Sequence, residues 1–284
     1  MSQSSAAATV CWVDGHLVGD TPSVRATDHG LTVGDGVFET CKVVDGQPFA
    51  LTRHLQRLAR SAAGLGLTVP DVALVRSGVA AVLAAAHLPF GRLRITMTGG
   101  PGPLGSDRAD VAPTYVVLAS AVPRPAPSAA VAVVPWVRNE RSAVAGLKTT
   151  SYAENVVALA YARERGAGEA LFANTRDELC EGTGSNVLLA LDGQLVTPPL
   201  SSGALAGITR ELLLEWAQRE GLPIEERTVG LAELARASEV ALTSSTRDVQ
   251  PVHAVDGRSL SLPGPLVAAA ADVFARAAAS DLDP

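Results

Sequence analysis

Lysine is nearly absent from this chain of 284 residues. Of its 23 basic residues, 21 are arginine, and only Lys42 and Lys148 are lysine. Arginine can replace lysine in surface solvation, but its guanidinium stays protonated and cannot act as an amine nucleophile or form a Schiff base. Any side-chain amine chemistry in this protein therefore uses one of these two residues.

Other scarcities exclude whole classes of protein. Cys11, Cys41 and Cys180 are too few and too scattered for a disulfide framework or a zinc site, so we expect reduced, buried thiols and no bound metal. No apolar run reaches the roughly 18 residues that a membrane-spanning helix needs. The net charge is -6 and no basic cluster lies beside aromatic residues, which argues against a nucleic acid or an anionic membrane as partner.

The first ten residues are rich in Ser and Ala and lack the basic start and apolar block of a signal peptide. The sequence therefore predicts a loose tail and a cytoplasmic protein. Farther along, residues 121–128 contain three prolines, which is typical of a stiff, extended linker. We expect a small N-terminal domain over 1–120, a linker over 121–129 and a larger C-terminal domain over 130–284.

Hairpins and helices alternate along the chain. Asp-Gly pairs lie between apolar stretches, the signature of two-residue turns between antiparallel strands. Arg92 and Arg94 alternate with apolar residues, which predicts a strand with two arginines on one face. The mixture indicates an α+β or mixed α/β class. The turns lie at 14–15, 45–46 and 192–193, helices are predicted over 53–65, 71–88, 152–165 and from 207, and further strands over 114–120, 131–134, 169–173, 187–191, 194–197 and 239–243.

The two lysines differ in their surroundings. Lys42 lies within a predicted strand and is interpreted as a strand surface residue. Lys148 lies between a glycine-containing turn and the start of the helix predicted over 152–165. A positive charge near a helix N-terminus is unfavourable, so a neutral or Schiff-base nitrogen would suit this position better than a solvated ammonium.

Several segments have the composition of a phosphate site. Residues 202–210 lead into a helix whose free N–H groups could hold an anion, and 243–246 supply a second group of hydroxyls after a strand. Arg57 could add positive charge, and Glu181 precedes a glycine-rich turn where a partly buried carboxylate would need a protonated partner. Each pattern alone is also typical of a plain helix cap or a solvated helix face.

Together, the motifs occur in the order and spacing of a known family. Across residues 12–255 the chain resembles the class IV, fold-type IV pyridoxal-phosphate (PLP) enzymes, which include branched-chain aminotransferases, D-amino acid aminotransferases and 4-amino-4-deoxychorismate lyases. The set is specific, whereas no single motif is. The motifs are GDGVFET (34–40), HLQRL (54–58), GLK (146–148), EGTGSN (181–186), TPP (197–199), GITR (207–210), SST (244–246) and PV (251–252).

The resemblance implies a homodimer that uses PLP, with a small N-terminal α/β domain and a larger C-terminal domain of β-barrel-like sheet plus helices. Lys148 then forms the Schiff base with PLP and moves the proton at the substrate α-carbon, and Glu181 is the partner of the protonated pyridine nitrogen. The other implied roles are phosphate binding by Arg57, Gly207, Ile208, Thr209, Ser244 and Ser245, contact of Tyr152 with the cofactor's phenolic oxygen, and substrate contact by Phe38 and Arg94.

Members of this family act on small amino compounds and differ in the substrate pocket. Thr40, which ends the first motif, matches a threonine characteristic of the lyases, so the resemblance favours pyruvate elimination from aminodeoxychorismate to give p-aminobenzoate, a folate precursor. Arg94 and the EGTGSN motif are more similar to aminotransferases. Thr98 stands where D-amino acid aminotransferases, and some lyases, carry a carboxylate-binding arginine. The alternative is a branched-chain or D-amino acid transaminase.

Two other classes of function fit the sequence less well. A binding module that kept the phosphate cradle but lost the chemistry would bind PLP without turnover, and Lys148 speaks against it. A serine hydrolase would need a Gly-x-Ser-x-Gly elbow, which the sequence lacks.

Overall fold

The proline-rich segment near residue 125 separates two units of the chain in a computed structural model, which describes residues 9–284 except 20, 261 and 263. Most of the predicted N-terminal tail, residues 1–8, lies outside the described residues. The second unit contains Pro125–Gly146 and Tyr152–Asp281. Two segments that we expected in the C-terminal domain, Leu147–Ser151 and Leu282–Pro284, pack instead with the first unit, because their hydrogen bonds run to its strands and helices.

The first unit is built on a six-stranded sheet with the order β2-β1-β6-β5-β3-β4. Its strand pairs are antiparallel, and the predicted hairpins are confirmed: Asp14 and Gly15, like Asp45 and Gly46, have the positive φ that a tight turn requires. The strands are β1 (Val10–Val13), β2 (His16–Val18), β3 (Gly36–Val44), β4 (Gln47–Pro48), β5 (Phe90–Thr98) and β6 (Tyr115–Ala121).

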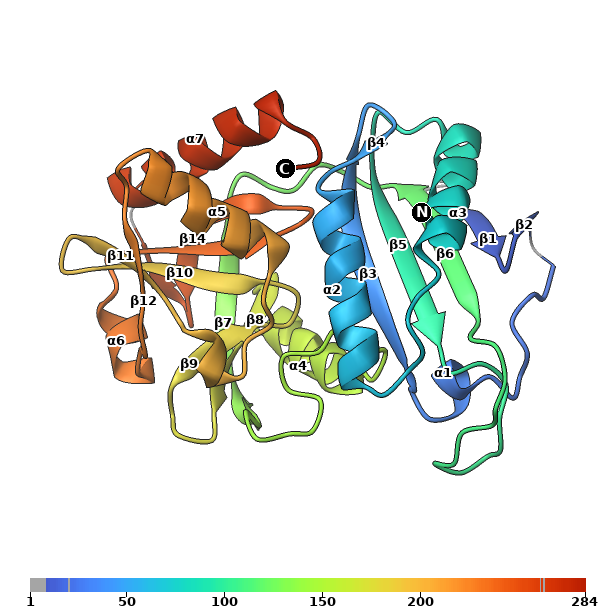
Figure 1. The fold of residues 1–284 in the computed structure, drawn as a ribbon. Coiled ribbons are helices and arrows are strands. Elements are labelled where there is room, and N and C mark those ends of the chain that lie inside the picture. Colours follow the sequence, from blue (N-terminus) through green and yellow to red (C-terminus); the bar gives the residue numbers. More distant parts are fainter. Residues whose placement is uncertain (1–8, 20, 261, 263) are drawn as a thin grey trace, which may run out of the picture. The chain divides into compact units, whose positions relative to one another are not determined.

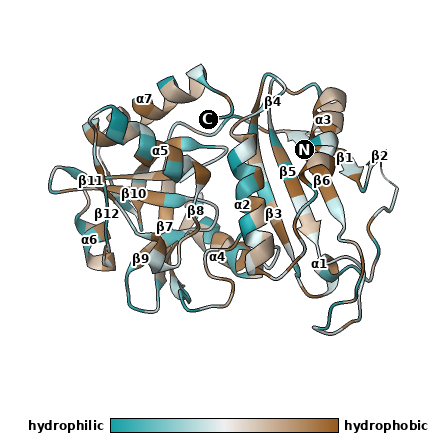
Figure 2. Cartoon of the chain, in the orientation of Figure 1, coloured by the Kyte–Doolittle hydropathy of each residue, from teal (hydrophilic) through white to brown (hydrophobic). Residues whose placement is uncertain are grey.

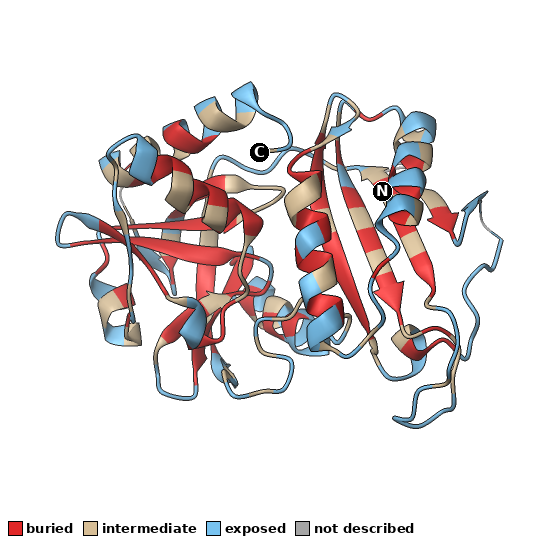
Figure 3. Ribbon diagram, viewed as in Figure 1, coloured by how far each residue is buried: buried red, intermediate tan, exposed pale blue. Residues whose placement is uncertain are grey.

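Helices α2 (Leu51–Gly64) and α3 (Val72–Ala86) pack along one face of this sheet, as Figure 1 shows, and both were predicted from their apolar spacing. A short helix, α1 (His29–Thr32), was not predicted. The face of the sheet beneath α2 and α3 is buried and, apart from Glu39, apolar, and the outer side of α2 is exposed (Figure 3). The core of the first unit therefore lies between the two helices and the alternate residues of β3, β5 and β6 that point toward them.

The opposite face of β3 and β5 is polar. Arg92 and Arg94 point to this side while their apolar neighbours are buried, which confirms the predicted alternation and gives the banding along β5 in Figure 2. The interpretation of Lys42 as a surface residue is wrong: it is 8% exposed. Its Nζ lies 4.9 Å from the centre of the Phe49 ring, so the stem is covered and the charge meets an aromatic face.

The second unit contains a nine-stranded sheet. Eight of its strands follow the order β12-β11-β10-β13-β14-β7-β8-β9, and the ninth, β15, pairs with β14. Although β9 and β10 are far apart in this order, only residues 183–185 separate them in the chain, so the sheet curls back on itself as a barrel-like layer. The strands are β7 (Ala129–Arg138), β8 (Glu169–Asn174), β9 (Leu179–Gly182), β10 (Asn186–Leu191), β11 (Gln194–Thr197), β12 (Ile224–Glu226), β13 (Glu239–Ser244), β14 (Asp248–Val255) and β15 (Arg258–Ser259).

Helices cover this second sheet, and the mixture of helices and antiparallel strands confirms the predicted fold class. α5 packs against α7, where the rings of Trp216 and Phe274 lie 5.2 Å apart between their centres. The long α7 and strand β14 were not predicted. The helices are α4 (Ala153–Glu164), the short 3-10 helix η1 (Leu200–Ser202), α5 (Ile208–Arg219), α6 (Leu231–Arg236) and α7 (Pro265–Ser280).

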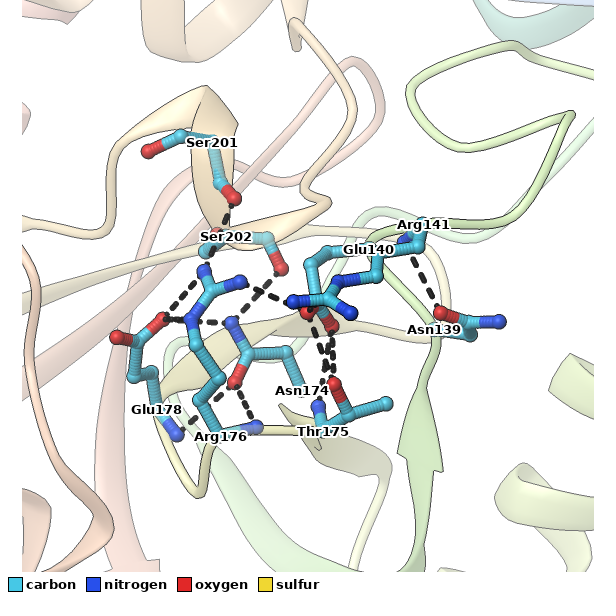
Figure 4. Close-up of polar contacts among 9 residues, drawn as sticks. All are labelled: Asn139, Glu140, Arg141, Asn174, Thr175, Arg176, Glu178, Ser201 and Ser202. Carbon is cyan, nitrogen blue, oxygen red and sulfur yellow. Dashed lines mark hydrogen bonds and ion pairs between the residues drawn. The ribbon is translucent and has the colours of Figure 1, made fainter.

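A polar cluster holds the turn between β8 and β9 (Figure 4). The Glu140 carboxylate accepts hydrogen bonds from the backbone N of Thr175 at 3.1 Å and from its Oγ1 at 2.8 Å. Arg176 bridges this carboxylate and Glu178, with N···O distances of 2.7 Å to each. The loop after β7 thus fixes the turn that leads into β9, the strand that carries Glu181.

Among the residues that the structure describes, we find no helix long and apolar enough to cross a membrane.

Candidate active site

Lys148 lies in an extended segment that pairs with the edge of β3. The backbone N of Phe38 donates to the Lys148 carbonyl at 2.9 Å, and Thr149 is the antiparallel partner of Val37. Directly opposed residues in an antiparallel pair point to the same face, so the Lys148 side chain shares the polar face of the sheet with Phe38. Gly146 has the positive φ of a turn and α4 begins at Ala153, so Lys148 lies between the turn and the helix as predicted.

Three predicted residues, Phe38, Thr40 and Arg94, share this polar face with Lys148. The Lys148 Nζ lies 4.5 Å from the centre of the Phe38 ring. The Arg94 guanidinium carbon lies 3.7 Å from the same ring centre. Thr40 is the direct cross-strand partner of Arg94 and lies two residues from Phe38 on the same face. The first unit therefore presents an amine, a guanidinium and a hydroxyl on one face of β3 and β5, around an aromatic ring.

Arg57 lies on the other side of β3 and is 4% exposed, so the alternative of a solvated helix face is wrong. Its Nε donates to Glu39 Oε1 at 2.8 Å, and its second terminal nitrogen donates to Oε2 at 2.7 Å. His54 Nδ1 lies 2.7 Å from the same Oε2. Burial opposes ionisation of Glu39, but the charge of Arg57 and the hydrogen bonds outweigh it and lower the pKa of Glu39 to about 2.

In the second unit, Glu181 on β9 is half-buried and fixed from two directions. Its Oε2 accepts a hydrogen bond from the backbone N of Leu205 at 2.8 Å. Its Oε1 lies 3.7 Å from Nε of Arg138, whose guanidinium also stacks 4.3 Å from the centre of the Phe172 ring. Arg138, at the end of β7, is therefore a charged neighbour of Glu181, and it also donates hydrogen bonds to Glu154 and Asn155.

Tyr152 is held at the turn that follows Glu181. Its hydroxyl donates to the carbonyl of Thr183 at 3.0 Å, and the Asn155 side chain donates to the same oxygen at 2.6 Å. Burial, with the nearby charge of Glu181, raises the pKa of Tyr152. The phenol therefore stays protonated, and its proton points to the backbone of Thr183.

The N-terminus of α5 comes close to the ends of β10 and β13. A Cβ added to Gly207 would lie 1.9 Å from the side-chain oxygen of Asn186, so only glycine fits there. Asn186 is also the cross-strand partner of Thr243, and its amide donates to the Leu205 carbonyl at 2.9 Å. Asn186 thus links the loop before α5 with the end of β13, where Ser244 and Ser245 follow.

This region fits a phosphate ester. Gly207 provides no side-chain cap for α5, so the first N–H groups of the helix, at Ile208 and Thr209, have no partner within the helix. Thr243 Oγ1 and Ser244 Oγ are buried and have no hydrogen-bond partner among the described residues. Buried hydroxyls are normally satisfied, so this set of donors is suited to an anion bound there.

The predicted site residues fall into two sets, one in each unit. Sequence reasoning missed Glu39, although it stands inside the first motif, and Arg138, which follows the apolar run of β7 with no local signal. The described residues contain no cluster of metal-ligating side chains. Burial raises the pKa of Cys180 to about 12, so this thiol stays protonated. The first set is Phe38, Thr40, Arg57, Arg94 and Lys148, and the second is Tyr152, Glu181, Gly207, Ile208, Thr209, Ser244 and Ser245.

Comparison with known proteins identifies the family of this chain. The profile of the family described as amino-transferase class IV matches residues 36–255. The bifunctional aminodeoxychorismate lyase / D-amino acid transaminase of Mycobacterium tuberculosis is 32% identical over 260 residues, which cover 84% of this chain and 88% of that protein.

Two solved structures share the fold. The branched-chain aminotransferase of Thermoproteus uzoniensis with norvaline has a TM-score of 0.86 and 30% identity, covering 94% of this chain and 93% of that one. A hypothetical aminotransferase of Mycobacterium tuberculosis in its PLP-bound form has a TM-score of 0.83 and 30% identity, covering 96% of this chain and 99% of that one. The chain therefore belongs to the class IV aminotransferase family of PLP-dependent enzymes.

Proposed function

We propose that this protein is a 4-amino-4-deoxychorismate lyase, which eliminates pyruvate from its substrate and leaves p-aminobenzoate. The observation that carries the proposal is the position of Thr40. It lies on the same face of β3 as Phe38, beside which Lys148 pairs, and directly opposite Arg94. A hydroxyl placed on the face that carries the amine suits a reaction that must move protons and release a leaving group.

The residues that would hold PLP are Lys148, as the attachment point, and those suited to its ring and phosphate. When bound, PLP supplies an electron sink that stabilises negative charge at the substrate carbon. The Glu181 carboxylate, whose Oε1 lies 3.7 Å from Nε of Arg138, would accept a hydrogen bond from the protonated ring nitrogen and so keep the proton on the ring. The phosphate would be held by Arg57, the N-terminus of α5 at Gly207, Ile208 and Thr209, and the hydroxyls of Ser244 and Ser245.

In the proposed reaction, side chains on the polar face of the first sheet move protons and bind the substrate. Lys148 removes the proton from the ring carbon that bears the amino group. The carbon–oxygen bond to the enolpyruvyl group breaks, the ring becomes aromatic, and the released enol becomes pyruvate. Arg94, whose guanidinium stacks on Phe38, offers a positive charge to a substrate carboxylate, and Thr40 lies beside it to exchange a proton with the leaving group.

A transaminase is the second candidate, and the relatives' names favour it. One relative is named for both lyase and D-amino acid transaminase activity, and a structure with 30% identity is a branched-chain aminotransferase. Thr98, at the position of a carboxylate-binding arginine in D-amino acid enzymes, donates instead to Asp28 Oδ2 at 3.0 Å and accepts from Gly100 N. This structural use of Thr98 favours branched-chain substrates over D-amino acids within the second candidate.

The first test is release of pyruvate and p-aminobenzoate from aminodeoxychorismate by PLP-loaded protein without a keto-acid acceptor. The lyase needs no acceptor, so we expect both products in equal amounts and sustained turnover. A transaminase would stop after one turnover per site, because it cannot regenerate its cofactor without an acceptor. Absence of product, with transfer from branched-chain L-amino acids or D-alanine to a keto acid, would replace the lyase with the second candidate.

Replacing Thr40 with valine separates the two reactions. Valine keeps the volume and branching of threonine on the strand but removes its hydroxyl. We expect the rate of pyruvate release to fall about 100-fold, the usual contribution of a positioned proton donor, with a change of less than about 3-fold in any amino-group transfer. Thr40→Ser, which keeps the hydroxyl, serves as the control. An equal loss of both reactions in Thr40→Val would remove the reason for preferring the lyase.

A further inference from the structure

We propose that Glu39 is a positioning residue that fixes the Arg57 guanidinium for the phosphate of the cofactor. The inference rests on the proposed use of PLP but not on which of the two reactions follows. Glu39 stands between Phe38 and Thr40, two strand residues on the face of the sheet that carries Lys148, yet its own side chain points to the opposite side of β3.

The carboxylate of Glu39 is enclosed and fully engaged. It is 0% exposed and receives two parallel hydrogen bonds from Arg57, at 2.8 and 2.7 Å, as well as the contact with His54 Nδ1 at 2.7 Å. A bidentate pair of this kind fixes both the direction and the plane of the guanidinium. Arginine has a long, flexible side chain. Without Glu39, the conformational entropy lost in fixing the Arg57 side chain would reduce the free energy of ligand binding.

Glu39 contacts two basic side chains, Arg57 and His54, in this cluster. Burial lowers the pKa of His54, so the imidazole is neutral near pH 7 and can donate its Nδ1 hydrogen to Glu39. Arg57 is then the cation that Glu39 neutralises, and the pair remains ionised because the pKa of Glu39 is lowered. The two hydrogen bonds to Glu39 use two of the five N–H donors of the Arg57 guanidinium.

Helix α2 also connects this pair to Lys148. His54, Arg57 and Ser61 lie on one face of α2 at spacings of three and four residues, and all three are buried. The Ser61 hydroxyl accepts a hydrogen bond from the backbone N of Lys148 at 3.2 Å. One helix face therefore holds the proposed phosphate arginine and, one turn later, the backbone of the proposed attachment lysine, which is the arrangement that a single rigid ligand requires.

The experiment compares PLP with pyridoxal, which has the same ring and aldehyde but no phosphate. Apo-protein is titrated with each compound, and binding is followed by quenching of tryptophan fluorescence. In Glu39→Gln the amide cannot neutralise Arg57 and offers one acceptor oxygen where the carboxylate offers two, so we expect about 10-fold or weaker PLP binding with pyridoxal binding changed by less than about 2-fold. Glu39→Asp, which keeps the charge but is one methylene shorter, should give a smaller loss in the same direction.

Two further variants control for structure. In an Arg57→Gln background, Glu39→Gln should cause no additional loss of PLP affinity, because the group that it positions is gone. Glu164→Gln, which removes the same charge from an exposed position on α4, should bind both compounds like the wild type. If Glu39→Gln fails to fold, the PLP and pyridoxal affinities of Glu39→Asp are compared with those of the wild type, and the thermal stability of each variant shows whether it is folded.

Several results would overturn the proposal. These are wild-type PLP affinity in both Glu39 variants, an equal loss of PLP and pyridoxal binding, or an additional loss in the Arg57→Gln background. A wild-type protein that binds PLP no better than pyridoxal would overturn it together with the assigned phosphate role of Arg57. If the lyase assay fails but the Glu39 variants still lose PLP affinity and keep pyridoxal affinity, only the proposed reaction is overturned.

Discussion

Replacement of Lys148 by alanine should abolish turnover while leaving both units folded. The variant loses the attachment point and the base that moves the substrate proton, so we expect turnover to fall by at least about 10,000-fold. The side chain itself contributes little to the core, since it lies half-buried against the Phe38 ring. Product release and the visible absorbance of bound cofactor at a wavelength specific for its covalent attachment measure the two losses separately.

Two substitutions make this result specific. Lys148→Arg keeps a positive charge near Phe38 but has no reactive amine, so it should be as inactive as the alanine variant. Lys42→Arg changes the only other lysine and should keep covalent attachment of the cofactor. Visible absorbance of attached cofactor in Lys148→Ala, or its loss in Lys42→Arg, would show that Lys148 is not the attachment point.

Glu181→Gln is expected to have the second largest effect, a fall in kcat of about 100- to 1,000-fold. A glutamine has no charge to stabilise a proton on the ring nitrogen, so the electron sink would be weakened in every turnover. Arg138 would then lie 3.7 Å from a neutral amide in place of an anion and would further disfavour a protonated ring. The kcat and the pH dependence of the bound-cofactor absorbance check this prediction.

Glu178→Gln is the matched control for this substitution. Glu178 precedes β9 by one residue and binds Arg176 in the turn cluster, so its replacement tests the effect of a lost carboxylate on local structure alone. We expect its kcat to stay within about 3-fold of the wild type. A kcat for Glu181→Gln within the same range would contradict the assigned role of Glu181.

Local patterns decided much of this fold in advance. Asp-Gly turns at 14–15 and 45–46 require positive φ whatever surrounds them, and the alternation at Arg92 and Arg94 sets the face of a strand by its period of two. Strand β14 and helix α7 were missed, because β14 has irregular alternation interrupted by Pro251 and α7 is rich in alanine, which carries a weak amphipathic signal.

The chemical identity of the site also came from the sequence. Because the chain has only two lysines, only two side chains could supply a reactive amine. The motif order from GDGVFET to SST indicated the class IV family that the comparisons establish. The roles of the individual residues remain predictions, which the substitutions above test.

Only the tertiary structure decided which side chains meet. Lys148 pairs with Phe38 across 109 intervening residues, Glu39 meets Arg57 beneath β3, and Arg138 meets Glu181 where the second sheet curls. Such pairs depend on strand register and on which helix covers which face, and no local propensity carries that information. The sequence by itself therefore determined the elements with strong local patterns and the kind of chemistry, whereas long-range packing determined the partners and charge states of the groups that would perform it.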